Sequence, residues 1–151
     1  ALIGEYPLSP PNNLVPVSTQ TAIGKRESMT VFGNDYDTPD GTCIRDYIHV
    51  VDLAWAHVRA LEWMEERTAP LCEVFNIGTG NGITVLDVVN TFMKVTGVNI
   101  PYTIGPRRPG DVESVYAETS KSGKVLGWKA ERGLDDALRD AWTWQCALQK
   151  K

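Results

Sequence analysis

The loop at residues 106–111, Pro-Arg-Arg-Pro-Gly-Asp, carries residue types suited to binding a phosphorylated ligand. Pro109-Gly110 favours a tight turn, because proline presets φ and glycine accepts positive φ. Such a turn holds the guanidinium of Arg108 and the carboxylate of Asp111 on one short loop. A planar fork of N–H donors suits a diphosphate, and a carboxylate accepts hydrogen bonds from sugar hydroxyls. The loop therefore indicates a nucleotide or nucleotide-sugar site, although a surface turn with an internal Arg–Asp pair has the same pattern.

The composition is typical of one globular domain. Of the 151 residues, 42% are hydrophobic and 23% are charged, which is enough to bury a core. The net charge of −4, without a basic stripe, argues against a nucleic-acid partner, and the apolar runs are too short to span a membrane. Three cysteines without CxxC spacing are typical of a reduced compartment, so we expect a cytoplasmic protein. No zinc-ligand spacing is present, and we expect no metal site.

Hydrophobic periodicity predicts an α/β fold with a small mixed sheet and surrounding helices. The helices are expected to begin at polar caps, such as Asn12-Asn13, and to end at glycines. The predicted elements are helix 13–24, strand 29–32, strand 44–50, helix 51–66, strand 73–77, a helix capped by Thr84 and ending at Gly97, strand 101–104, strand 114–117, helix 119–126 and helix 134–148.

Two of these elements carry polar residues of interest. Strand 44–50 alternates apolar and polar residues and is expected to present Arg45, Tyr47 and His49 together on its polar face. Helix 51–66 has an apolar face of Leu53, Ala54, His57, Val58, Leu61 and Met64, on which His57 is expected to pack in the core.

Two segments match a binding motif only in part. The acids of loop 33–43 lack the alternate spacing and closing glutamate of an EF-hand, so we interpret it as a plain acidic loop. The strand–loop–helix at 73–96 has glycines spaced G-x-G-x-G at Gly78–Gly82, and no acidic residue follows at the ribose position of a dinucleotide site. Close packing of strand and helix explains these glycines better than phosphate binding.

Acid–base machinery is not evident. No tyrosine is followed by a lysine four residues later, and no G-x-S-x-G, H-E-x-x-H or P-loop motif occurs. We therefore expect no catalytic and no cofactor-binding residue in this chain. Its first residue is Ala1, within what reads as a loop, so we expect residues 1–151 to be a single partial unit of a longer or processed protein.

An ordered set of motifs resembles the C-terminal half of the UDP-glucose 4-epimerases, a family of extended short-chain dehydrogenases/reductases. The resemblance covers nearly the whole chain and is specific in order and spacing. The matching motifs are Asn12-Asn13-Leu14-Val15-Pro16, Thr30-Val31-Phe32-Gly33-Asn34-Asp35-Tyr36, Asp40-Gly41-Thr42, Arg45-Asp46-Tyr47-Ile48-His49-Val50-Val51-Asp52-Leu53-Ala54, Asn76-Ile77-Gly78-Thr79-Gly80, Pro106-Arg107-Arg108-Pro109-Gly110-Asp111 and Leu126-Gly127-Trp128-Lys129-Ala130.

The resemblance implies a UDP-sugar site. Asn13 is expected to meet the diphosphate from a helix N-terminus, which agrees with the free N–H groups and dipole there. By the same resemblance, the remaining site residues are Thr30 and Phe32 at the uracil, Arg45 and Arg108 at the diphosphate, Tyr47 beside the nucleotide and Asp111 at the ribose hydroxyls. The family carries a tyrosine or a small residue four positions after that aspartate, where this chain has Val115 beside Tyr116, and either could face the sugar.

The resemblance also implies an activity. In the family, NAD bound to the N-terminal Rossmann domain takes hydride from C4 of the sugar, and the 4-keto sugar rotates before hydride returns. This chain would hold UDP-glucose or UDP-galactose, would bind no NAD itself and would be inactive alone. The alternatives are a non-catalytic nucleotide-sugar binding module, or another extended short-chain enzyme on a nucleotide sugar, such as a 4,6-dehydratase or a decarboxylase.

The resemblance further implies a packing partner. Helix 51–66 and strand 73–77 are apolar enough to need one, and in the family such elements pack on the N-terminal domain. Without that domain we expect a large exposed apolar patch, which favours association, with a homodimer among the possible outcomes.

Overall fold

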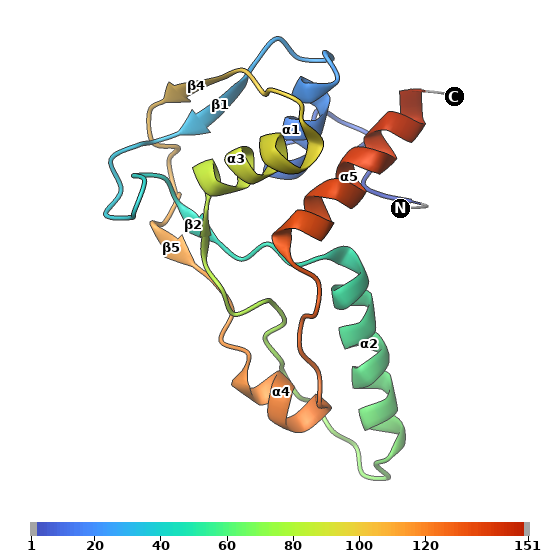
Figure 1. Cartoon of the computed structure of the whole chain (residues 1–151). Helices are drawn as coiled ribbons and strands as arrows, with labels where there is room; N and C mark the ends of the chain where they lie inside the picture. Colours follow the sequence, from blue (N-terminus) through green and yellow to red (C-terminus); the bar gives the residue numbers. More distant parts are fainter. Residues whose placement is uncertain (1–2, 150–151) are drawn as a thin grey trace.

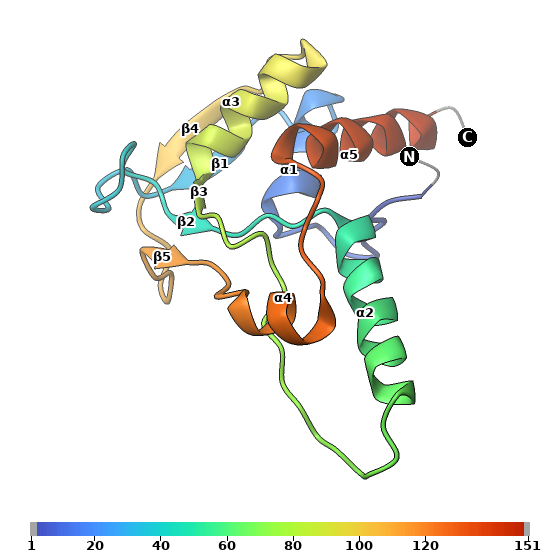
Figure 2. The ribbon, with the colours of Figure 1, turned by 60° about the horizontal axis from the view of Figure 1, so that its bottom comes forward.

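A computed structural model describes residues 3–149 and shows a mixed α/β fold (Figure 1). The β1–β4 pair lies beside α1, α3 and α5, and α2 and α4 lie together at the other end of the molecule (Figures 1 and 2). In chain order the elements are α1 (Leu14–Ala22), β1 (Met29–Phe32), β2 (Ile44–Arg45), α2 (Val50–Glu65), β3 (Ile83–Thr84), α3 (Val85–Thr96), β4 (Tyr102–Gly105), β5 (Ser114–Val115), α4 (Ser120–Leu126) and α5 (Leu134–Gln149).

The strands form two small sheets. In the first, β1 and β4 are parallel, with Met29 opposite Tyr102 and Phe32 opposite Gly105. In the second, β2 lies between antiparallel β3 and parallel β5, so that Arg45 is opposite both Ile83 and Val115. The expected α/β class with a small mixed sheet is confirmed, and the second sheet is the mixed one.

The larger core lies where α1, α3 and α5 meet β1. Phe92 of α3 is fully buried, and its ring meets Trp142 of α5 edge-on at 5.7 Å between centroids. The α3 helix forms as its sequence predicts, because the Thr84 side chain accepts from Asp87 N and Gly97 ends the helix at a φ of +70°. The buried apolar side chains of this core are Met29, Val31, Val88, Val89, Phe92, Ile100 and Leu138.

Two strand predictions are wrong. Strand 44–50 ends after Arg45, because the chain leaves the ladder there and His49 becomes the N-cap of α2, accepting from Val51 N at 3.0 Å. Residues 73–77 form no strand and run back past α4 as an extended segment (Figure 2). Alternation predicts which side of a strand is buried, but a strand also needs a neighbouring strand to bond with. Among residues 3–149, neither segment has one.

The buried face of α2 also differs from the prediction. Asp52 and Ala56 are buried, since they face α4 and Trp128, whereas the predicted apolar face remains open to solvent. On that face Leu61 is 60% exposed and Met64 is 51% exposed. His57 is exposed too, so the expected packing histidine is wrong. The expected apolar patch is therefore present.

No helix in the part of the chain described here is long and apolar enough to cross a membrane.

Candidate functional site

Three of the predicted site residues converge at one point. Arg108 donates to Asp111 through both Nε, at 3.2 Å, and Nη2, at 2.8 Å. Arg45 Nη2 lies 3.6 Å from Asp111 Oδ1. Two guanidinium groups from separate elements therefore share one carboxylate, which is more than an isolated surface turn would provide. Such a pair of cationic forks can bind a diphosphate.

The second sheet sets this geometry. Arg45 closes β2, and β5 begins three residues after Asp111 and pairs with β2 in parallel. Asp111 N donates to Arg108 O at 3.1 Å, and Gly110 takes a φ of +85°, so the turn predicted from Pro-Gly is formed. Ile44 N donates to Glu113 O at 2.8 Å and fixes the turn against β2.

Thr30 and Phe32 lie on the exposed face of β1. The strand alternates, with Met29 and Val31 buried and with Thr30 and Phe32 turned outward. The Arg108 guanidinium lies 5.7 Å from the centre of the Phe32 ring. An aromatic face beside a cationic fork suits a nucleotide, because the base stacks on the ring while its phosphates meet the arginine.

Tyr47 and Asn13 are not brought into the Arg45–Arg108–Asp111 cluster by a hydrogen bond or ion pair among residues 3–149. Tyr47 packs against the larger core, and its burial there raises the pKa of its hydroxyl to about 12. Arg45 lies near enough to oppose part of that rise in the pKa of Tyr47. The predicted strand face that would carry Arg45, Tyr47 and His49 together is not formed, because the strand ends at Arg45. Asn13 is the N-cap of α1 as predicted, but its side chain makes no capping bond, and its Nδ2 donates to Glu5 Oε1 at 3.4 Å.

Asp46 organises the neighbouring loop, a role that the sequence reasoning missed. Its carboxylate accepts from Thr79 N at 2.9 Å, Thr79 Oγ1 at 2.6 Å, Gly80 N at 3.1 Å and Ala117 N at 3.2 Å. Burial raises the pKa of Asp46, but these bonds outweigh it and hold the pKa below its ordinary value. Residues more than thirty positions apart take part, so no local pattern announces the interaction.

The same bonds decide the function of the glycine loop. The amides of Thr79 and Gly80, which a dinucleotide phosphate would need, already donate to Asp46. A Cβ on Gly78 would lie 2.3 Å from Asp46 Oδ2, so glycine is required for the carboxylate to approach. Close packing therefore explains Gly78, against Asp46, and Gly82, against Ile44 and Tyr116, and neither contact is between a strand and the helix that follows.

An open hollow of about 610 Å³ is lined in part by Arg45 and has room for a small ligand such as a sugar. Val115 lies opposite Arg45 in the β2–β5 register and so shares its side of the sheet. Tyr116 turns toward Gly82, where an added Cβ would meet its ring at 2.9 Å. The lining residues are Arg45, Asp46, Phe75, Asn76, Ile77, Val115, Tyr116, Ala117 and Glu118.

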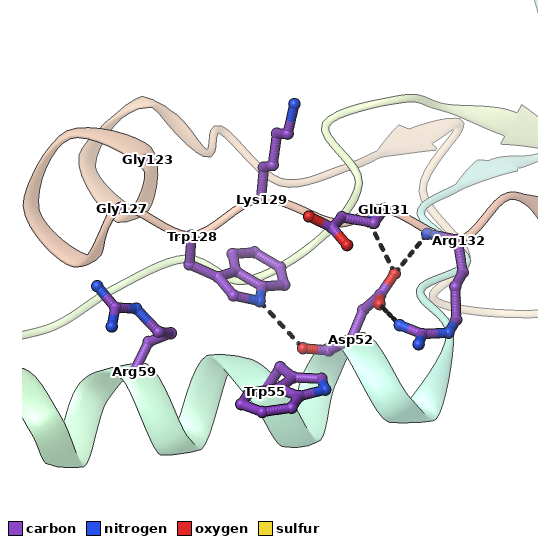
Figure 3. Close-up of a pocket in the computed structure, with 9 residues that line it drawn as sticks. All are labelled: Asp52, Trp55, Arg59, Gly123, Gly127, Trp128, Lys129, Glu131 and Arg132. Carbon is purple, nitrogen blue, oxygen red and sulfur yellow. Dashed lines mark hydrogen bonds and ion pairs between the residues drawn. The ribbon is translucent and has the colours of Figure 1, made fainter.

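A second hollow, of about 410 Å³, lies between α2 and α4 (Figure 3). Its central carboxylate, Asp52, accepts from Glu131 N at 2.9 Å, from Arg132 N at 2.8 Å and from the Arg132 guanidinium. Trp128 Nε1 donates to the backbone oxygen of Asp52 at 3.2 Å (Figure 3). Because these groups are paired with one another, we interpret them as the contact that holds the segment before α5 against α2, and not as a ligand site.

The acidic loop at 33–43 is also engaged internally. Asp40 accepts from Thr42 N at 2.9 Å and from the hydroxyls of Thr42 and Thr84, and Asp35 pairs with Arg107. Within residues 3–149, no group of three or more His, Cys, Asp or Glu side chains is placed to hold a metal ion.

Comparison with known proteins gives consistent matches. The family model for GDP-mannose 4,6 dehydratase matches residues 6–141. The UDP-glucose 4-epimerase of Bacillus subtilis is 50% identical over 143 residues, which are 95% of this chain and 42% of the relative. The structure resembles that of a UDP-glucose 4-epimerase from Stenotrophomonas maltophila with bound NAD and formylated UDP-arabinopyranose, with a TM-score of 0.91 and 45% identity over 98% of this chain and 44% of that one.

A second solved structure carries the nucleotide itself. The UDP-glucose 4-epimerase of Bifidobacterium longum, in complex with NAD⁺ and UDP, has a TM-score of 0.89 and 46% identity over 95% of this chain and 42% of its own. The chain therefore spans about two fifths of the length of the proteins that it matches.

Proposed function

The chain belongs to the GDP-mannose 4,6 dehydratase family of extended short-chain dehydrogenases/reductases, and we propose that it is the UDP-sugar-binding part of a UDP-glucose 4-epimerase. The observation that carries this proposal is the convergence of Arg45 and Arg108 on Asp111, beside the exposed ring of Phe32. The high identity to UDP-glucose 4-epimerases across nearly the whole chain supports it and favours an epimerase over a 4,6-dehydratase or a decarboxylase.

In this proposal the arginines bind the diphosphate and supply affinity rather than bond-making chemistry. Without a ligand, Asp111 keeps both guanidinium groups close together, which orders the site before UDP arrives. When the two arginines bind the diphosphate, the Asp111 carboxylate is released from them and can accept hydrogen bonds from the ribose hydroxyls. Thr30 and Phe32 present their exposed face to the uracil, and Asn13 and Tyr47 are further contacts that the family resemblance implies.

We further propose that the rest of the enzyme covers the open face of α2. This face carries exposed Val58, Leu61 and Met64, and Val74 in the extended segment at 73–77 is 75% exposed. Exposed apolar side chains gathered on one helix are typical of an interface, and the segment at 73–77 needs a neighbouring strand. A domain packed here would cover the apolar face of α2 and provide a neighbouring strand for the segment at 73–77. NAD and the bond-making residues belong to that part in this proposal, and the engagement of the glycine-loop amides by Asp46 supports it.

Calorimetric titration of the purified chain with UDP tests the nucleotide assignment. We expect UDP to bind with a stoichiometry of one, UDP-glucose and UDP-galactose to bind about equally because the proposed contacts are to UDP, and affinity to fall with added salt. GDP serves as the control, because guanine is larger than uracil and because GDP is the nucleotide in the description of the matching family model. No binding of UDP, or GDP binding as tightly as UDP, would count against the proposal.

A further inference from the structure

The two neighbouring arginines of the 106–111 loop engage different partners. Arg108 faces Asp111, whereas Arg107 turns toward the loop that follows β1. Arg107 Nε donates to Asp35 Oδ1 and its Nη2 donates to Asp35 O, each at 2.7 Å. The guanidinium also lies 4.0 Å from the centre of the Tyr36 ring, so one face of it is stacked. Arg107 thus binds a second loop, and its fork is occupied there.

Tyr36 connects Arg107 to the end of β1. The ring is 5% exposed and occupies the space in which a side chain at residue 33 would lie. A Cβ on Gly33 would come within 2.5 Å of Tyr36 Cε2 and 3.1 Å of Arg107 Cγ, and the backbone there has a φ of +78°. Gly33 directly follows Phe32, and its N–H donates to Gly105 O at 2.9 Å. Arg107, Tyr36 and Gly33 therefore form one continuous stack.

We propose that Arg107 is a positioning residue that fixes the distance between Phe32 and the Arg108–Asp111 pair. Phe32 lies on β1, and the Arg108–Asp111 pair lies on the loop after β4. The distance between them therefore determines whether one ligand reaches both. When two subsites are held at the right spacing, engaging the first raises the effective concentration at the second. Arg107 thereby couples recognition of the base to recognition of the diphosphate. This inference rests on the proposed binding of UDP.

The chemistry at this position requires arginine. A planar guanidinium can stack on Tyr36 while two of its nitrogens donate to Asp35, whereas the compact ammonium of lysine cannot make both interactions. Arg107→Lys keeps the charge but loses the stack. The lysine variant therefore separates a positioning role from direct binding of phosphate, in which charge is the main requirement.

The experiment compares three ligands that occupy different parts of the site. Dissociation constants for UDP, uridine and inorganic diphosphate are measured by chemical-shift titration of the chain and of its Arg107→Ala and Arg107→Lys variants. We expect UDP to bind about tenfold more weakly to both variants, with uridine and diphosphate each within about twofold of the unmodified chain. The control is Arg67→Ala, which removes an arginine that also stacks on an aromatic ring, 3.8 Å from the centre of Trp63, but just after α2 and outside the proposed site, so UDP affinity should not change.

The outcomes are distinguishable. If the unmodified chain does not bind UDP, the proposed function and this inference both fail. If it binds UDP and Arg107→Ala binds UDP within about twofold, the positioning role alone is overturned. Weaker binding of diphosphate that Arg107→Lys restores would make Arg107 a direct phosphate ligand, and an equal loss of uridine binding would make its role one of folding. Either result would overturn the inference.

Discussion

The Arg108→Ala variant is expected to raise the dissociation constant of UDP by about 10–150-fold, because losing one charge-assisted contact costs ~1.5–3 kcal/mol. Arg108 makes the closest contacts in the cluster, through two nitrogens to Asp111, and its side chain is 52% exposed, so it is accessible to a ligand. Its removal leaves Arg45 alone at the diphosphate. Calorimetric titration with UDP measures the change directly.

The matched control for this variant is Arg139→Ala. Arg139 is equally exposed and also pairs with a carboxylate three residues away, Asp136, but it lies on α5 and belongs to no proposed subsite. We expect its UDP affinity to equal that of the unmodified chain. A titration curve for Arg108→Ala that overlays the control would remove Arg108 from the site.

The Asp52→Ala variant is expected to lower the free energy of unfolding by about 3 kcal/mol, since partly buried donors that lose their acceptor cost ~1–3 kcal/mol each. The donors concerned are the N–H groups of Glu131 and Arg132, which Asp52 ties to the start of α2. The Asp52 carboxylate is almost completely buried, so little solvent reaches it to replace the lost bonds. Urea unfolding checks this, with a lower midpoint at an unchanged m-value.

Asp136→Ala is the control for the effect on stability. This carboxylate is about half exposed and pairs with Arg139 on the surface of α5, and such pairs contribute ~0–1 kcal/mol. The midpoint of Asp136→Ala should therefore lie close to that of the unmodified chain. If Asp52→Ala unfolds at the same urea concentration as Asp136→Ala, the contact between α2 and the segment before α5 does not depend on Asp52.

The parts of the fold that were predictable are those encoded locally. The cap at Thr84, the left-handed glycine at Gly97 and the turn at Pro109-Gly110 each involve residues within a few positions of one another. The pairing of Arg108 with Asp111 is equally local, at three residues. For such features, residue type and spacing determine the geometry, and the sequence was sufficient.

The parts that were not predictable depend on distant partners. Asp46 and Asp52 bond with residues that lie 33 to 80 positions later, and nothing near either aspartate indicates this. The segment at 73–77 reads as a strand but has no neighbour to pair with among the described residues. Similarly, the apolar pattern of α2 predicted an amphipathic helix, but the helix has apolar residues on two of its faces. Only the contacts with α4 and Trp128 determine which face is buried.

The most direct test of the central claim is a chimera with the Bacillus subtilis UDP-glucose 4-epimerase, in which this chain replaces the region that it matches. With NAD, the chimera is predicted to interconvert UDP-glucose and UDP-galactose, and the purified chain with NAD is predicted to show no turnover. Amide hydrogen exchange at residues 73–77 should also be slower in the chimera than in the chain alone, because a neighbouring strand becomes available. A folded chimera that binds NAD but has no epimerase activity, or turnover by the chain alone, would contradict the account.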